Sequence, residues 1–270
     1  MTEIRAWTRA RDGKVSYEYS RELQRLASIE KDLNVFLTEH SPELATLHRT
    51  KAEEVFRNVV SESPFDHEAV ELPAFQTLLS EVNPLQRLML TYACILVGLN
   101  AEDSADEVPI SREAQVRTQM YPVFYLFQAL LRTSERDSAL ALLKDFVDGR
   151  MKSLTPSQPD LPDPGQWWDE LETPSDVTEG VAARFGRGKI AFRVDNCILH
   201  DVMEPLGDPE LADVVCCYGD KSGFEALNPN LVFTRTDTLM TGPYCDTCMH
   251  DKRFVDDIEH PDHEFFQGLS

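Results

Sequence analysis

The chain lacks a long uninterrupted apolar run. Its two most apolar windows, residues 85–99 and 121–131, are too short or too often interrupted by polar residues to cross a bilayer. We therefore expect buried core helices there and no membrane partner. The first residues, MTEIRAWTRARDGK, contain no apolar stretch typical of a secretory signal, which predicts a cytoplasmic protein.

Basic residues are scarce relative to acidic ones. The chain has 26 Lys and Arg against 47 Asp and Glu, for a formal net charge of −21 at pH 7. A negative field of this size repels nucleic acid and anionic lipid, and no stretch of the chain interleaves basic and aromatic residues. We expect no nucleic-acid partner. An anionic small molecule would need an arginine placed locally against this background.

Familiar catalytic and cofactor motifs are also missing. No H-E-x-x-H, G-x-S-x-G or Rossmann glycine pattern occurs, and FGRGK at 185–189 fails the P-loop spacing because Ala183 and Ile190 stand at required positions. C-x-x-C occurs once, at 245–248, and a structural zinc site would need a second half. On a regular strand Cys245 and Cys248 would point to opposite faces. We expect no cofactor and no metal, although a zinc-binding role stays an alternative.

The distribution of apolar residues predicts an α+β fold. Residues 1–154 show helical spacing, with helix starts indicated by Ser41-Pro42 and Asn83-Pro84. Residues 155–188 form a proline-rich linker followed by a short helix from Thr173 to about Phe185.

Residues 189–250 contain most of the cysteines and follow the order β-α-α-β-β, with KIAFRVDNC as the first strand. Residues 251–270 are an acidic tail that we expect to be poorly ordered. The fold expected is a helical N-terminal half packed on a small antiparallel sheet in the C-terminal third, as one compact unit.

The six cysteines are unevenly placed. Cys94 stands alone in an apolar helix and is expected to be a buried small hydrophobe. The other five fall between Cys197 and Cys248, and without a secretory signal we expect them to be reduced thiols. His200 follows Cys197 by three residues, which on a helix start allows a Cys–His nucleophile, although an exposed surface histidine is the commoner case.

Charged residues interrupt the strand VFTRTDTLM. Arg235 and Asp237 share a strand face, and a half-buried arginine needs an anionic partner. That partner is either Asp237 or Asp246 in a structural pair, or the carboxylate of a small-molecule substrate. A three-residue loop at 241–243 would place Cys245 on the Arg235 face and leave Cys248 off it, whereas a two-residue Gly242-Pro243 loop would place Cys245 on the threonine face. An active-site role for Cys245 predicts the first arrangement.

At this point the residues resemble a known family. Its pattern is a cysteine after a strand, then L-G-x-P-E-L, C-x-x-D, R-T-x-T-L-x-x-G and C-D, and about 55 residues of this chain carry these elements in order. They are Cys197, Leu206-Gly207, Pro209-Glu210-Leu211, Cys217, Asp220, Arg235-Thr236, Thr238-Leu239, Gly242 and Cys245-Asp246. The chain resembles the L-2-amino-thiazoline-4-carboxylic acid hydrolase family.

The resemblance implies a hydrolase that adds water to a small heterocyclic or amide-like substrate and opens its C–N/C–S ring. Within it we expect Cys217, Cys245, Cys197, Asp220 and Asp246 as catalytic candidates. Arg235, Thr236, Thr238, Asp237 and His200 are the candidates for substrate binding. Either a cysteine thiolate attacks the substrate or acidic residues activate water. A cofactor-free isomerase or cyclase acting on a reactive natural-product intermediate remains open, as does a non-catalytic metal- or ligand-binding domain.

Overall fold

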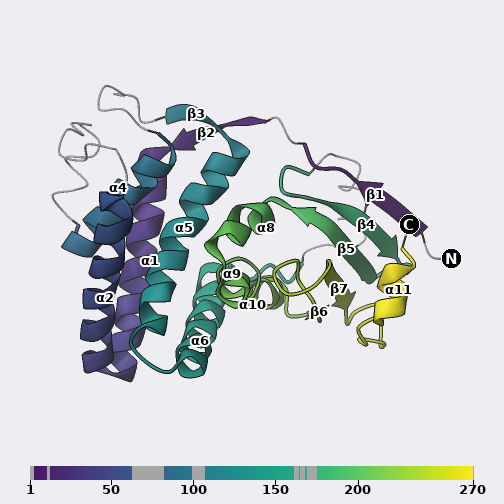
Figure 1. Ribbon diagram of the computed structural model, residues 1–270. Coiled ribbons are helices and arrows are strands. Elements are labelled where there is room, and N and C mark those ends of the chain that lie inside the picture. The colour runs from purple at the N-terminus through teal and green to yellow at the C-terminus, as the bar shows by residue number, and fades with distance from the viewer. Residues whose placement is uncertain are drawn as a thin grey trace. The chain divides into compact units, whose positions relative to one another are not determined.

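A computed structural model describes residues 3–10, 13–62, 82–98, 107–160, 164, 168 and 175–269 of the protein. It has the mixed α+β composition predicted, with helices and a five-stranded antiparallel sheet (Figure 1). Its contacts define two compact units, one of residues 12–146 and one of residues 1–11 with 147–270.

The unit of residues 12–146 is mainly helical, and its helices begin where the sequence indicates. The Ser41 side chain accepts the N–H of Leu44, and Asn83 forms a reciprocal capping box with Gln86. The unit also contains a two-stranded sheet that the sequence did not suggest. Its elements are β2 (Lys14–Glu18), α1 (Tyr19–His40), α2 (Pro42–Ser61), α4 (Pro84–Leu96), β3 (Glu107–Ser111), α5 (Arg112–Leu131) and most of α6 (Arg136–Leu154).

The second unit is built on a five-stranded antiparallel sheet. Its strands, in spatial order, are β1 (Glu3–Trp7), β4 (Thr178–Arg184), β5 (Lys189–Cys197), β7 (Cys245–Asp251) and β6 (Leu231–Arg235). Strand β5 matches the predicted KIAFRVDNC. The helix predicted from Thr173 to Phe185 is wrong, because its described part contains β4. Val181, Ala182 and Ala183 are all buried there, so the run has no alternation that would mark it as a strand.

One face of this sheet, here called the helical face, is covered by short helices (Figure 1). These are α8 (Ile198–Met203), the 3₁₀ turn η1 (Glu204–Leu206), α9 (Pro209–Cys216) and α10 (Asp220–Leu227). The predicted β-α-α-β-β order is present, with α10 as an addition. A core of apolar side chains fills the space beneath: Trp7, Ala182, Ile190, Phe233 and Met249, with Trp168 and Phe224.

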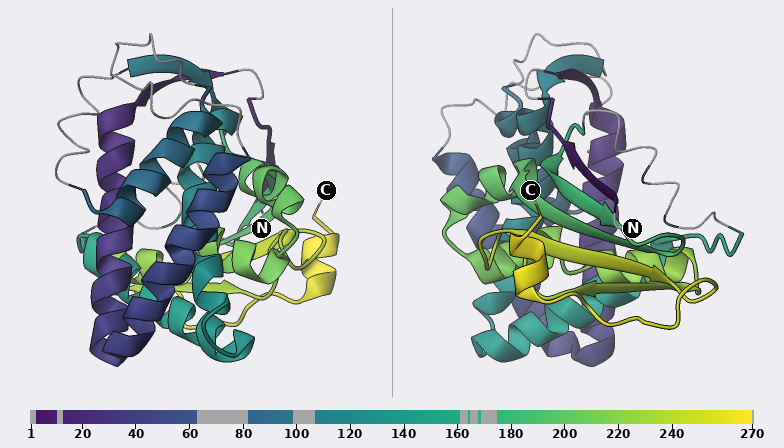
Figure 2. Two further views of the ribbon diagram at one scale, coloured as in Figure 1. Left: turned by 60° about the vertical axis from the view of Figure 1, so that its left-hand side comes forward. Right: turned by 90° about the vertical axis from the view of Figure 1, so that its right-hand side faces the viewer.

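The opposite face, here called the C-terminal face, is covered by residues 252–269, which include α11 (His263–Gln267). Figure 2 (right) shows this yellow segment on the side of the sheet that faces the viewer. Phe266 and Leu269 pack on Val181, Ala191 and Cys248. The segment therefore makes ordered contacts, and the expectation of a poorly ordered acidic tail is wrong.

A β-bulge decides which face receives Cys197. Glu179 pairs with Asn196 but Gly180 pairs with Val194, so Asp195 is an extra residue in β5. Simple alternation would point Cys197 away from the face of Val194, and the extra residue returns it to that face. Gly180 is required here, because a Cβ at this position would lie 2.0 Å from the carbonyl oxygen of Arg193.

None of the helices in the described part of the chain is both long enough and apolar enough to cross a membrane.

Candidate active site

The register of β6 against β7 sorts the predicted residues between the two faces of the sheet. Arg235 pairs with Thr247, and Thr234 pairs with Cys248. Because directly paired residues point to the same side, Cys245 shares the helical face with Arg235 and Cys248 lies on the other face. This is the arrangement that the hairpin sequence predicts.

The hairpin connection is longer than predicted. Strand β6 ends at Arg235 and β7 begins at Cys245, so residues 236–244, here called the pocket loop, replace the expected three-residue turn. The N–H groups of Thr236 and Asp237 both donate to the Asp246 carboxylate, at 2.8 Å each, instead of continuing the strand ladder. The register differs from the expected one by an even number of residues, which leaves the facing of Cys245 unchanged.

Arg235 lies at the centre of the helical-face site. Its Nη1 is 2.8 Å from Asp220 Oδ2, and its Nη2 donates to the carbonyl oxygen of Cys217 at 2.5 Å. The side chain is 13% exposed. Its carboxylate partner is thus Asp220 rather than the predicted Asp237 or Asp246. Burial raises the pKa of Asp220, and the guanidinium of Arg235 offsets part of that rise.

A pocket of about 220 Å³ opens beside Arg235. Its volume suits a ligand smaller than a typical drug-sized molecule. Three predicted residues line it, namely Arg235, Thr236 and Thr238, and Thr238 Oγ1 donates to Asp213 Oδ1 at 2.7 Å. The remaining lining residues are Asp213, Tyr218, Lys221, Phe233 and Thr241.

Asp213 and Lys221 are the charged lining residues that sequence reasoning missed. Asp213 interrupts the apolar run LADVVC of α9, and an acidic residue within such a run was the available signal. Lys221 belongs to α10, a helix not recognised in the sequence, and pairs with Glu225.

The predicted residues Cys197, Cys217 and Cys245 are not among those that line this pocket. Cys217 and Cys245 lie close enough to Arg235, and Cys197 close enough to Cys245, for their charges to interact. Burial raises the pKa of Cys217 far above its usual range, and it also raises the pKa of Cys197. Burial raises the pKa of Cys245 to about 11, although the N–H of Leu239 donates to its Sγ at 3.1 Å. At neutral pH these groups are therefore thiols rather than thiolates.

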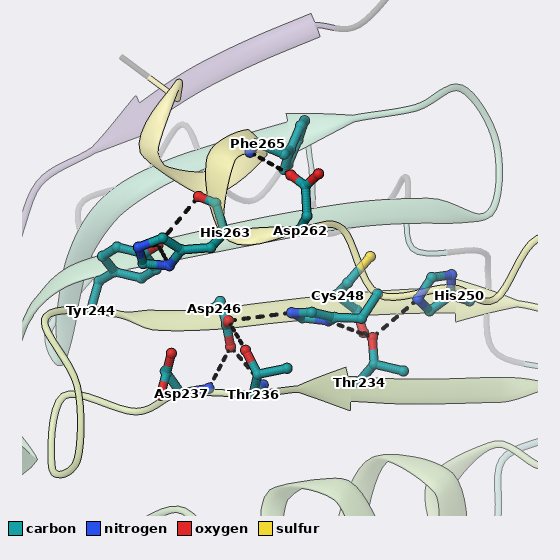
Figure 3. A network of polar contacts seen from close by, with 11 residues as sticks. Thr234, Thr236, Asp237, Tyr244, Asp246, Cys248, His250, Asp262, His263 and Phe265 are labelled. Atoms are coloured by element: carbon teal, nitrogen blue, oxygen red, sulfur yellow. Dashed lines mark hydrogen bonds and ion pairs between the residues drawn. The ribbon is translucent and has the colours of Figure 1, made fainter.

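Asp246 lies on the C-terminal face and is 2% exposed. Burial alone would raise its pKa. Hydrogen bonds from His260, the N–H groups of Asp237 and Thr236, and the Thr236 hydroxyl lower the pKa to about 2. Figure 3 shows Thr236 and Asp237 beside this carboxylate. Asp246 is thus an anchor of the pocket loop, on the opposite side of the sheet from the thiols.

The two other predicted residues lie outside the pocket lining among the described residues. His200, in α8, is half-buried with Nδ1 3.7 Å from Asp201 Oδ1. Asp237 belongs to the pocket loop, where its carbonyl oxygen accepts the N–H of Asp246. In the described ranges, no three His, Cys, Asp or Glu side chains are grouped so as to hold a metal ion.

A larger cavity of about 700 Å³ lies in the unit of residues 12–146, between β2, α1 and α5. Arg25 lines it but is already engaged by the carboxylate of Glu22 and the carbonyl of Gln119. None of the residues predicted for the site lines this cavity, so the smaller pocket beside Arg235 is the stronger candidate.

The comparison with protein families matches residues 114–249 to the profile of L-2-amino-thiazoline-4-carboxylic acid hydrolase. The chain belongs to this family. The match begins two residues into α5, ends two residues before the end of β7, and includes every predicted site residue. It ends before the segment that covers the C-terminal face. No significant match was found among curated proteins or solved structures. Family membership supports a hydrolase-like activity in general terms.

Proposed function

We propose that the protein hydrolyses a small carboxylate-bearing heterocycle of the 2-amino-thiazoline type in the pocket beside Arg235. The observation that carries this proposal is the placement of a buried guanidinium at a small pocket within the family-matched region. Arg235 and Lys221 supply the positive charge needed to hold a carboxylate against the strongly acidic background of the chain.

In this reaction the oxygen of water bonds to the C2 carbon and the C2–S bond breaks. One water proton goes to the ring nitrogen and the other to the departing sulfur, so that a thiol and a carbamoyl group result. Asp213 is the proposed base for water, because its carboxylate lines the pocket and is oriented by Thr238. Asp220 is paired with Arg235 and is not among the residues that line the pocket, so its proposed role is to orient the guanidinium toward the substrate carboxylate.

The buried thiols are not the proposed nucleophiles. Since burial holds Cys217 and Cys245 in the protonated form, water rather than a thiolate is the proposed attacking group. Cys217→Ser and Cys245→Ser should then each keep turnover within about tenfold of the wild type. A loss of about 1,000-fold or more in either variant would instead assign covalent catalysis to that cysteine.

The substrate assignment is tested with Arg235→Gln. Its kcat/KM for L-2-amino-thiazoline-4-carboxylate should fall by about 100-fold, because a charge-assisted contact to the carboxylate is lost. Arg9→Gln is a matched control, since Arg9 Nη1 also lies 2.8 Å from a carboxylate, that of Asp201, and is 12% exposed, but does not line the pocket.

A carboxylate-free analogue, 2-amino-thiazoline, sharpens the experiment. The wild type should process it slowly, and Arg235→Gln should change its rate little. An equal loss on both compounds would contradict the carboxylate assignment. Reaction in ¹⁸O-labelled water separates the hydrolase from an isomerase or cyclase, because only hydrolysis places the label in the product carbamoyl group.

A further inference from the structure

A chain of polar contacts crosses the C-terminal face from Asp257 to Asp246. His250 Nδ1 lies 3.3 Å from the carbonyl oxygen of Asp257, and His250 Nε2 lies 3.2 Å from Thr234 Oγ1. Thr234 Oγ1 is in turn 2.9 Å from His260 Nδ1, and His260 Nε2 is 3.3 Å from Asp246 Oδ2. Figure 3 shows Thr234 between His250 and the Asp246 side of this chain.

The number of protons needed by this chain exceeds what neutral side chains supply. It has four links and ends at both sides on acceptors, a backbone carbonyl and a carboxylate. The Thr234 hydroxyl also lies 3.3 Å from the carbonyl oxygen of Cys248, a further acceptor that adds to the demand for protons. Neutral His250, neutral His260 and Thr234 bring one proton each, which satisfies three links. With three protons, one contact would lack a proton, and two acceptor atoms would face each other in a buried site, which is energetically costly. One additional proton satisfies all four links.

The surrounding charges place this proton on His260. Its Nε2 is buried without a partner in hydrogen-bond geometry and lies 3.3 Å from a carboxylate oxygen of Asp246, which holds its negative charge at a pKa of about 2. His250 is completely buried and near Lys189, and burial followed by that cation lowers its pKa. An imidazolium at His260 donates to both Asp246 and Thr234, while Thr234 donates to the neutral ring of His250.

Other charged groups on this side are engaged elsewhere or balance the site. The Asp257 carboxylate pairs with Lys189 at 2.9 Å. Arg193 pairs with Asp195 and also donates to the carbonyl of Phe266. The remaining nearby groups are Asp237, whose charge acts on Tyr244, and Tyr244 itself, whose hydroxyl contacts His263. None of these contacts supplies an alternative cation to Asp246.

Asp246 connects this chain to the pocket. The same carboxylate accepts the N–H groups of Thr236 and Asp237 at the start of the pocket loop. Two residues further on, Thr238 contacts Asp213 in the pocket, and the N–H of Leu239 contacts Cys245. The position of the Asp246 carboxylate therefore sets the position of a loop that lines the pocket on the other side of the sheet.

We propose that His260 is a positioning residue that carries an additional proton and, through Asp246, holds the pocket loop in its binding geometry. The segment that supplies His260 lies beyond the residues that match the family profile. The structural part of the proposal is independent of the reaction. Its effect on turnover rests on the function proposed above.

Nitrogen-detected NMR of the histidine rings in the full-length protein tests the proton count directly. At pH 6.5 the ring of His260 should carry protons on both nitrogens, and the ring of His250 on Nδ1 alone. A neutral His260 ring at pH 6.5, with the segment still packed on the sheet, would overturn the proposal.

Amide hydrogen exchange tests the coupling to the loop. In His260→Gln and Thr234→Val, exchange at the Thr236 and Asp237 amides should accelerate by about tenfold or more, because the Asp246 carboxylate loses its fixed partner. Thr234→Ser keeps the hydroxyl and should retain wild-type exchange. Asp257→Asn is the matched control, since it removes the ion pair to Lys189 but leaves the contact to Asp246 in place.

The exchange experiment distinguishes a specific effect of His260 on the pocket loop from a general loosening of the C-terminal segment. Equal acceleration in Asp257→Asn and His260→Gln would show that loosening of the segment alone is responsible, which overturns the role of His260. With the substrate above, His260→Gln should raise KM more than it lowers kcat. Unchanged exchange in His260→Gln contradicts the proposal even if the protein proves not to be a hydrolase.

Discussion

Alternate residues of β7 belong to two different chemical environments. Cys245, Thr247 and Met249 face short helices, an arginine and a pocket, whereas Asp246, Cys248 and His250 face a polar chain and the C-terminal segment. On the helical face burial keeps acidic groups protonated to higher pH, as at Cys245 and Asp220. On the C-terminal face hydrogen bonds keep Asp246 ionised. One strand thus separates groups whose pKa is raised by burial from a carboxylate whose pKa is lowered by hydrogen bonds.

The bulge at Gly180 offers the largest effect on this separation. Gly180→Ala places a Cβ 2.0 Å from the backbone oxygen of Arg193, which cannot move without disturbing β5. We expect a loss of about 3 kcal/mol in the free energy of unfolding, measured by urea denaturation. Gly13→Ala is the control, because no described atom lies within 4 Å of its added Cβ. Equal stability in the two variants would contradict the assigned register.

Lowering the pH should change the free energy of unfolding differently for carboxylates on the two faces, by an amount smaller than the effect at Gly180. The pKa of Asp246 is lowered to about 2, so its contribution to stability is complete above the unfolded value near 4 and is lost as the pH falls toward 2. The pKa of Asp220 is raised, so its charged form weakens the fold at higher pH and acidification relieves that effect.

Asp246→Asn should therefore destabilise the protein by about 2 kcal/mol at pH 7, and this difference should vanish near pH 2. Asp220→Asn should show no such convergence. Unfolding curves between pH 2 and pH 7 measure both variants. A constant gap between wild type and Asp246→Asn across this range would mean that the carboxylate is not the ionised anchor of the loop.

Thiol alkylation gives the smallest effect and requires no substitution. Burial raises the pKa of Cys245 to about 11 and that of Cys248 to about 12. Cys245 is also partly exposed, whereas Cys248 is completely buried. Iodoacetamide should modify Cys245 about tenfold faster, with rates that rise steadily from pH 7 to 10, as peptide mass mapping can follow. Faster modification of Cys248 would reverse the assignment of the two faces.

Local signals in the sequence were sufficient for much of the fold. Caps at Ser41 and Asn83 located helix starts, and the alternation of KIAFRVDNC located β5. Strand β4 was missed because it is buried on both sides, and β1 pairs with it across more than 170 residues of sequence. Local patterns do not carry such pairings.

Individual residues of the site were predictable from the sequence, but their distribution between the two faces of the sheet was not. The alternation of side chains along the hairpin correctly placed Cys245 on the same face as Arg235. The carboxylate partner of Arg235, Asp220, comes from a helix that the sequence did not reveal. Asp246 was grouped with the thiols because it follows Cys245 directly. Its orientation depends on the strand pleat, and its partner His260 lies in the segment expected to be poorly ordered.

The extra residue Asp195 limits which insertions and deletions strand β5 can accept during evolution. Substitutions along β5 alter what each face presents, but a single deletion between Val194 and Cys197 would rotate the thiol to the far side of the sheet without altering any residue type. The orientation of Cys197 therefore depends on the number of residues in β5 as much as on their identities. Gapless alignment through β5 against β4 is the feature by which relatives with the same thiol placement should be recognised.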